Sequence, residues 1–262
     1  MNTSLPGIEE SRVFFAEAQL PPLTNSPKIL GFSAGAEEGG DTRISDSDFL
    51  VGKDAAAVLG FTDKLDGDRK QAAADSIHFA ERYAKTKADI NKEPVAWHNH
   101  YGQAMMHCGW TMTSSKYQQH VNRQVNVTMD SIVLDIIQAV AGQNAPAMLG
   151  LLSGVFDKLK SEEKLVTLFD KNSKSGMDAD FRIVPCLQSP AGTAITAFLA
   201  VDLKLTTNEG GAWFWKWKLS ELKMNKVATM VELNMRIHER NQKAIYEALG
   251  KSSDDFFSGV KL

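Results

Sequence analysis

The chain has few of the features that mark common classes of protein. Its 262 residues contain two cysteines, Cys108 and Cys186, which are too few for the disulfide framework of a small secreted protein. The net charge is -3, whereas nucleic-acid binding needs concentrated Lys and Arg. Continuous apolar runs fall far short of the ~20 residues that a membrane-spanning helix needs. We therefore expect a globular protein without a nucleic-acid partner.

We also expect no secretory signal peptide, because the given sequence does not open with a basic patch followed by an apolar block. With only two cysteines and no signal peptide expected, we expect synthesis in a reducing cytoplasm. Release to act on a host, by lysis or by a specialised secretion system, stays open.

Catalytic motifs are scarce. Gly31-Phe-Ser-Ala-Gly35 matches the five-residue pattern of a hydrolase nucleophile elbow. That elbow requires a buried strand before the serine and a helix after it. Here only Ile29-Leu30 precede the pattern, and a Glu-Glu-Gly-Gly loop follows it. A Gly-rich loop is the better interpretation, and a hydrolase with Ser33 as nucleophile and His238 as base is kept as an alternative. We expect no catalytic residues and no enzymatic activity.

Histidines are concentrated in one short segment. His98, His100, His107 and Cys108 lie within eleven residues, and imidazole and thiolate are the natural ligands of zinc. On a helix, however, positions 98 and 100 point in different directions. An amphipathic helix with half-exposed histidines is therefore favoured, and we expect no metal site.

Tryptophan, by contrast, is concentrated in one predicted strand, Trp213-Phe-Trp-Lys-Trp-Lys. Successive side chains of a strand point to opposite faces, so Trp213, Trp215 and Trp217 share one face. That face is either part of the core or a surface that meets lipid. A third alternative is that it packs against a neighbouring subunit, which would make the protein self-associate.

The hydrophobic pattern predicts a single α+β domain, in which helices pack against an antiparallel sheet. Residues 1–65 contain several prolines and predict an irregular arm, or edge strands, that wraps a body formed by residues 66–262. The elements expected in that body are helices over 68–90, 93–108 and 234–249 and strands over 117–127, 181–187, 194–205, 213–219 and 226–232.

Two strongly apolar segments, 131–141 and 145–159, predict a helical hairpin that is broken at Gly142-Gln-Asn144. Each arm spans only ~20 Å, short of the ~30 Å hydrocarbon thickness. A hairpin buried in the core is therefore favoured. A pore former that unfolds the hairpin onto a bilayer stays an alternative, with Ile136 and Leu152 among its lipid-facing candidates.

Cys186 follows Pro185, which has no N–H to give to a sheet, so we expect the thiol near a strand end. The neighbouring apolar segments suggest a position at the rim of the hairpin and of the tryptophan face. Buried cysteines are usually inert. A lipid chain attached to Cys186 would nevertheless find apolar surroundings there.

Four segments together resemble a known family of bacterial and fungal proteins that includes the Evf-type virulence factors, which help bacteria persist in insect guts. The similarity covers about residues 70–262. The segments are Trp97-His-Asn-His-Tyr with Gly109-Trp110, Leu168-Phe-Asp-Lys-Asn-Ser173, Trp213-Phe-Trp-Lys-Trp-Lys, and Ile245-Tyr-Glu-Ala-Leu-Gly250 with Phe256-Phe257.

The resemblance implies a protein without enzymatic activity that carries palmitate in thioester linkage to a cysteine. Cys186 is the position that fits this role best, and Cys108 is the second choice. The function that follows is that of a virulence or insect-host persistence factor, associated with lipid through the acylated cysteine and acting at host membranes. An insecticidal toxin that permeabilises membranes is the alternative.

Overall fold

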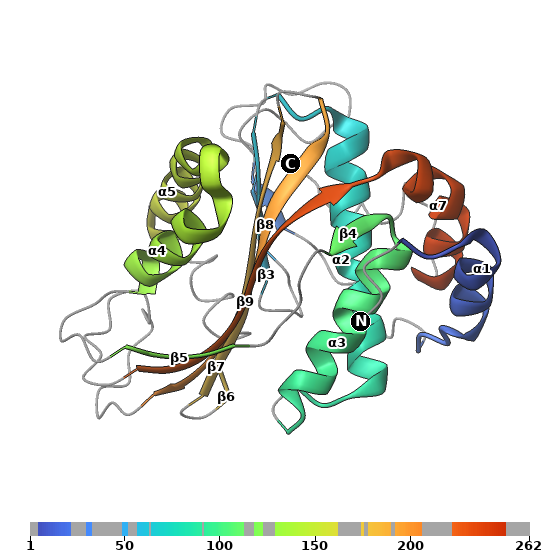
Figure 1. The fold of residues 1–262 in the computed structure, drawn as a ribbon, viewed down its shortest axis with the longest axis horizontal. Helices are drawn as coiled ribbons and strands as arrows, with labels where there is room; N and C mark the ends of the chain where they lie inside the picture. Colours follow the sequence, from blue (N-terminus) through green and yellow to red (C-terminus); the bar gives the residue numbers. More distant parts are fainter. Residues whose placement is uncertain are drawn as a thin grey trace.

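A nine-stranded sheet forms the centre of the computed structural model (Figure 1). The strand order is β1-β2-β3-β7-β8-β9-β4, while β5 pairs with β9 and β6 with β7. Only β3 and β7 run parallel, and the other pairs are antiparallel. The structure describes residues 5–21, 30–32, 49–51, 57–62, 64–90, 92–112, 118–122, 129–161, 174–175, 178–189, 192–205 and 222–249. The predicted single α+β domain is confirmed.

Three long strands dominate the sheet. The expected strands over 181–187, 194–205 and 226–232 are found as β7, β8 and β9. The strands are β1 Leu30–Phe32, β2 Phe49–Val51, β3 Ala57–Phe61, β4 Trp110–Met112, β5 Gln118–Asn122, β6 Lys174–Ser175, β7 Asp178–Gln188, β8 Ala194–Leu205 and β9 Leu222–Leu233.

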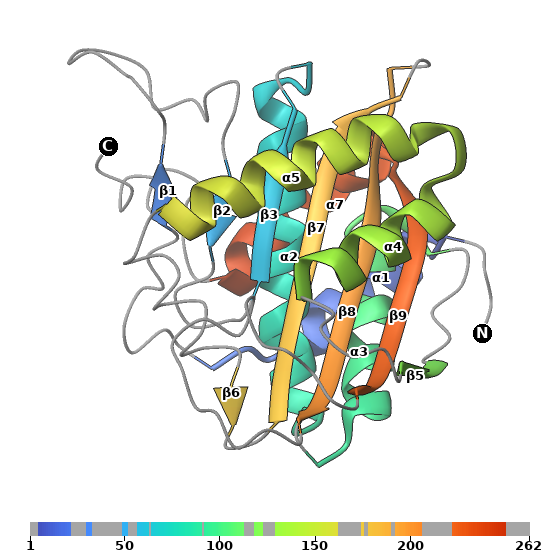
Figure 2. The ribbon, with the colours of Figure 1, turned by 90° about the vertical axis from the view of Figure 1, so that its left-hand side faces the viewer.

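Helices cover both faces of the sheet and make a three-layer molecule (Figure 1). One face carries α1, α2, α3 and α7, which share a hydrophobic cluster with the sheet. The other face carries the α4–α5 hairpin (Figure 2). The helices are α1 Ile8–Glu17, α2 Gly67–Lys87, α3 Pro94–His107, α4 Met129–Ala141, α5 Ala145–Ser161 and α7 Met235–Leu249, and the short turn η1 Gly142–Asn144 joins α4 to α5.

The predicted helix starts are found where capping chemistry places them. The Asp66 carboxylate accepts a hydrogen bond from the backbone N–H of Arg69 at the start of α2. Asn234 does the same for the N–H of Ile237 at the start of α7. Pro94 occupies the first turn of α3, where its missing N–H costs nothing.

The described part of the first 65 residues is more regular than the sequence predicts. Strands β1, β2 and β3 extend one side of the sheet, as the prediction of edge strands allows. Helix α1, by contrast, is an ordered core helix, because its Phe14 ring stacks on His107 at 3.8 Å between ring centroids. That contact joins positions far apart in the chain, so local pattern could not reveal it. The division into an arm and a body stays a prediction.

Candidate functional site

The α4–α5 hairpin lies across strands β3, β7, β8 and β9 (Figure 2). Ile136 of α4 and Leu152 of α5 are both buried, so the predicted burial of the apolar residues of the hairpin is confirmed. The opposite face of the hairpin meets solvent and carries small and polar residues such as Gln138, Gly150 and Ser153. Every buried side chain of the hairpin is apolar within the described residues: Val133, Ile136, Ile137, Ala141, Ala145, Met148, Leu152, Val155 and Phe156.

The face of the sheet beneath the hairpin is equally apolar. Strand alternation points one set of buried residues to this side: Val58, Ile183, Leu187, Ile195 and Ala197. Gly60 of β3 lets α5 approach closely, because a Cβ atom there would lie 2.8 Å from Cγ2 of Val155. We call the contact between these two surfaces the hairpin seat. Its described buried side chains are held by apolar packing alone.

On the opposite face of the sheet, buried charged side chains join the strands to the helices. Arg182 of β7 points to α2, where its Nη2 donates a hydrogen bond of 3.1 Å to Oε2 of Glu81, and its Nε contacts Oε1. The same guanidinium lies 4.6 Å from the centre of the Trp97 ring. Both charged side chains are buried. Separating the layers on this side would leave buried charges without partners, which is strongly unfavourable.

The Arg182–Glu81 pair is a feature that sequence reasoning missed. The available signal was an arginine within the mostly apolar segment 181–187, between Phe181 and Ile183. Its partner lies 101 positions away in the chain. Nothing in the local pattern of α2 singles out Glu81 as that partner.

Of the histidines expected on a half-exposed helix face, His100 is partly exposed as predicted, whereas His98 and His107 are buried. Burial lowers the pKa of His98 to about 3, and the nearby Arg182 charge acts in the same direction. Burial also lowers the pKa of His107, to about 4. Both imidazoles are therefore neutral at pH 7. Within the described ranges, no three His, Cys, Asp or Glu side chains are grouped so that they could hold a metal ion.

Burial also lowers the pKa of His238, although its hydrogen bond to the Cys108 backbone raises it. Its Nδ1 lies 3.1 Å from the Cys108 carbonyl oxygen, so Nδ1 carries the proton and donates. This interaction ties α7 to the end of α3. The serine for which His238 was a candidate base, Ser33, lies outside the described residues, so the hydrolase alternative is not tested by this geometry.

Cys186 lies near the end of β7, as predicted, and is fully buried. It belongs to the cluster between the sheet and the helices α2 and α3, together with Phe61 and Val184. The preceding residue, Pro185, is paired with Gly60, which contacts α5. Strand alternation therefore points Cys186 away from the hairpin, and the thiol does not lie at the rim where the sequence predicts it.

The Cys186 thiol has low nucleophilic reactivity in the folded protein. Burial raises its pKa to about 12, and the hydrogen bond with Thr196 only partly offsets this. Since the thiolate is the reactive form, attack on an acyl donor is disfavoured in the folded protein. Cys108, at the end of α3, is also buried, and burial raises its pKa well above the ordinary value. Neither thiol is an exposed acceptor.

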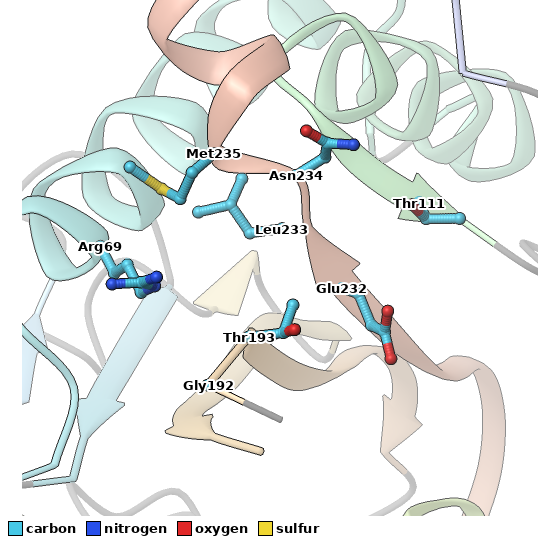
Figure 3. Close-up of a pocket in the computed structure, with 8 residues that line it drawn as sticks. All are labelled: Arg69, Thr111, Gly192, Thr193, Glu232, Leu233, Asn234 and Met235. Atoms are coloured by element: carbon cyan, nitrogen blue, oxygen red, sulfur yellow. The ribbon is translucent and has the colours of Figure 1, made fainter. Parts of the chain in front are cut away.

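The predicted tryptophan face and a surface cleft are the remaining candidate features. Trp213, Trp215 and Trp217 are outside the described residues, so their face stays a prediction. A cleft of about 430 Å³ opens elsewhere, beyond the ends of β9 and of the β7–β8 hairpin, and no residue of α4 or α5 is among its described lining residues (Figure 3). Among the described helices, none combines the length and hydropathy that crossing a bilayer requires.

Comparison with protein-family models and with curated proteins finds no match. Among solved structures, the chain is similar to one described as the structure of the Evf virulence factor. That similarity has a TM-score of 0.41 and 13% sequence identity, and it covers 94% of this chain and 88% of that chain. A delta-endotoxin is also similar, with a TM-score of 0.37, 14% identity, and 81% of this chain and 90% of that chain covered. The first is the type of protein that the four aromatic segments resemble.

Proposed function

We propose that the protein acts on lipid membranes without catalysis, as a toxin-like virulence factor that permeabilises a host bilayer through the α4–α5 hairpin. The observation that carries the proposal is the hairpin seat, whose described buried side chains are apolar on both sides. When such a hairpin moves from the sheet to lipid, its apolar contacts with the sheet are replaced by apolar contacts with acyl chains. Among the described residues, every buried side chain of the hairpin is apolar, so none of them loses a polar partner in the exchange.

The helical layer on the opposite face of the sheet, which contains α2, is attached more firmly than the α4–α5 hairpin. Its release would separate Arg182 from Glu81 and leave both charges unpaired. The sheet and that layer therefore stay together as a rigid body. The hairpin is the layer that detaches at lower cost.

The dimensions of the hairpin indicate how it meets the bilayer. Helices α4 and α5 contain 13 and 17 residues. At 1.5 Å per residue they are about 20 and 26 Å long, less than the ~30 Å of hydrocarbon. We expect both helices to lie in the plane of the interface, with buried residues such as Leu152 turned to the acyl chains and Gln138 and Ser153 turned to the headgroups.

Release of an encapsulated dye from liposomes tests this function. We expect purified protein at micromolar concentration to release dye from phosphatidylcholine vesicles or from vesicles that also contain phosphatidylglycerol. Heat-denatured protein is the control for nonspecific disruption. Intact vesicles of both compositions in the presence of native protein would contradict the proposal.

We also propose that Cys186 is the residue that carries a palmitoyl thioester. Its fully buried, apolar surroundings support this, since each CH₂ that is buried contributes about 0.8 kcal/mol. Because the folded thiol is sealed and its pKa is raised to about 12, acylation has to precede the closure of the helices over the sheet. The chain would then fold around the lipid.

Intact mass before and after neutral hydroxylamine, which cleaves thioesters, tests the acylation. We expect an added mass of one fatty acyl chain that disappears on treatment. The added mass should be missing in Cys186→Ser and present in the matched variant Cys108→Ser. An unmodified mass in the wild-type protein would contradict the acylation and leave the action of the hairpin to be judged by dye release alone.

A further inference from the structure

Helix α1 is the outermost element of its helical layer, where it packs beside α7 and away from the sheet (Figure 1). Its buried residues Ser11, Phe14 and Phe15 recur at helical spacing and form one face. Between ring centroids, Phe15 lies 5.1 Å from Phe79 of α2, and Phe14 lies 4.7 Å from Tyr83 of the same helix. Ser11 is therefore a polar residue inside an otherwise aromatic contact.

His107, at the end of α3, meets this face of α1 in two ways. Its ring stacks on Phe14, with 3.8 Å between the ring centroids and 6° between the ring planes. Its Nδ1 lies 3.2 Å from the Oγ of Ser11, and both side chains are buried. A neutral imidazole satisfies the serine hydroxyl without bringing a charge into the contact. A protonated imidazole would place a charge there, which burial makes unfavourable.

A second polar attachment holds the chain directly after α1. Arg82 of α2 donates from Nη2 to the backbone carbonyl of Pro21, and from Nη1 to the carbonyl of Leu249 at 3.1 Å. Arginine stays charged in acid as at neutral pH. This attachment therefore does not respond to acid, and it keeps the end of α1 next to α7 when the helix itself moves.

The groups around His107 determine how acid acts on the contact. Burial lowers the pKa of His107 to about 4, and the charge of Glu10 on α1 only partly offsets this. From α7, the uncharged Asn241 donates a hydrogen bond to the His107 backbone carbonyl. From α2, Tyr83 stays neutral, because burial raises its pKa. When α1 is detached, the imidazole meets water, where its pKa is about 6.5.

We propose that His107 is an acid-sensitive switch that releases α1 from α2, α3 and α7 while the rest of the domain stays folded. Above about pH 6.5 the imidazole is neutral in both states, and the contact has its full strength. As the pH falls from there towards about 4, the detached state binds the proton first, and that stability is lost.

Release of α1 would uncover an apolar surface without separating the sheet from α2. Phe14 and Phe15 on α1 and Phe79 on α2 would become accessible. The ion pair between Glu81 and Arg182 joins α2 to β7 and is not part of the α1 contact. The inference goes beyond the proposed membrane action and does not depend on it, since the release of α1 needs no lipid.

Hydrogen–deuterium exchange of the full chain tests the switch, with rates corrected for the intrinsic effect of pH on amide exchange. We expect the protection of residues 8–17 to fall on the order of tenfold between about pH 7.5 and about pH 5, while β7 and β8 keep theirs. His107→Gln, whose amide does not gain a proton at these pH values, should remove the fall. The matched control is His100→Gln, which changes a partly exposed histidine of the same helix and should respond like the wild type.

Three results would overturn the switch. The first is equal protection of α1 at both pH values, and the second is a fall of the same size in His107→Gln. The third is a loss of protection in β7 and β8 together with α1, because acid would then unfold the whole domain.

If glutamine at position 107 does not hold α1 even at neutral pH, an NMR titration of the His107 imidazole in the wild-type protein decides. We expect a pKa of about 4. An ordinary value of about 6.5 with α1 still protected would overturn the switch. Neither experiment contains vesicles, so failure here leaves the dye-release result untouched, and failure of dye release leaves the exchange result untouched.

Discussion

At the scale of single residues, burial controls the chemistry of the titratable groups. It disfavours the charged form of each, so it raises the pKa values of Cys186 and Asp75 and lowers those of His98 and His107. The effect is the same for a thiol, a carboxyl and an imidazole. These groups are consequently neutral over much wider ranges of pH than they are in water.

Burial of Asp75 makes the free energy of unfolding depend on pH in a predictable direction. Burial raises its pKa to about 6, against the opposing hydrogen bonds from Gln71 and Tyr246. A raised folded pKa contributes stability that is present below about pH 4 and is lost as the pH rises through about 6.

We therefore expect the stability of Asp75→Asn relative to the wild type to increase as the pH rises. The difference in free energy of unfolding between variant and wild type should grow by on the order of 1–3 kcal/mol from about pH 4 to about pH 8. Urea denaturation at the two pH values measures it. A difference that does not change with pH would show that Asp75 has the same pKa in the folded and unfolded protein.

At the scale of elements, the two helical layers differ in how they are attached. Helix α5 rests on β3 at Gly60, where apolar atoms meet without a hydrogen-bonded anchor among the described side chains. Helix α2 is tied to β7 by the buried ion pair between Glu81 and Arg182. In the proposed function, the first attachment is the one that is exchanged for lipid, because separating the second would leave buried charges without partners.

Gly60→Ala should weaken the hairpin seat. The added Cβ would lie 2.8 Å from Cγ2 of Val155, so α5 has to move away from the sheet. We expect a loss of about 1–3 kcal/mol in the free energy of unfolding and faster dye release. Gly150→Ala is the matched control, because a Cβ there meets nothing within 4 Å on the exposed face of α5. If Gly60→Ala released dye no faster than Gly150→Ala, the seat would not limit activity.

Substitutions in the buried Arg182–Glu81 ion pair should change stability in a non-additive way. Arg182→Met leaves Glu81 buried without its partner, which should cost about 3–5 kcal/mol in urea unfolding. Adding Glu81→Leu should recover most of that loss, since both charges are then gone. A double variant as unstable as Arg182→Met would mean that the stability comes from packing of the arginine stem and not from the pair.

At the scale of the whole molecule, the sequence predicts elements better than contacts. The strand over 194–205, the helices over 68–90 and 234–249, and the apolar hairpin all follow from local pattern, because hydrophobic period and turn signals depend on neighbouring residues. The side on which Cys186 lies depends on register within the sheet, and the partner of Arg182 on a contact across 101 positions. Local pattern contains neither piece of information.

The most direct test of the account is a reversible lock on the hairpin seat. A Cβ at position 60 lies 2.8 Å from Cγ2 of Val155, and one further C–C bond of about 1.5 Å places the two Cβ atoms within the reach of a disulfide. The variant Gly60→Cys/Val155→Cys should therefore form a bond that holds α5 on β3. Cys108 and Cys186 are buried and should not compete.

The measurement is dye release by this double variant before and after reduction, with Gly60→Cys and Val155→Cys alone as controls. If the hairpin has to leave the sheet, the oxidised protein should release no dye and the reduced protein should regain release, while the single variants should respond to reductant like the wild type. Equal release by the oxidised and reduced double variant would contradict the account, because the membrane would then be permeabilised with the hairpin still in its seat.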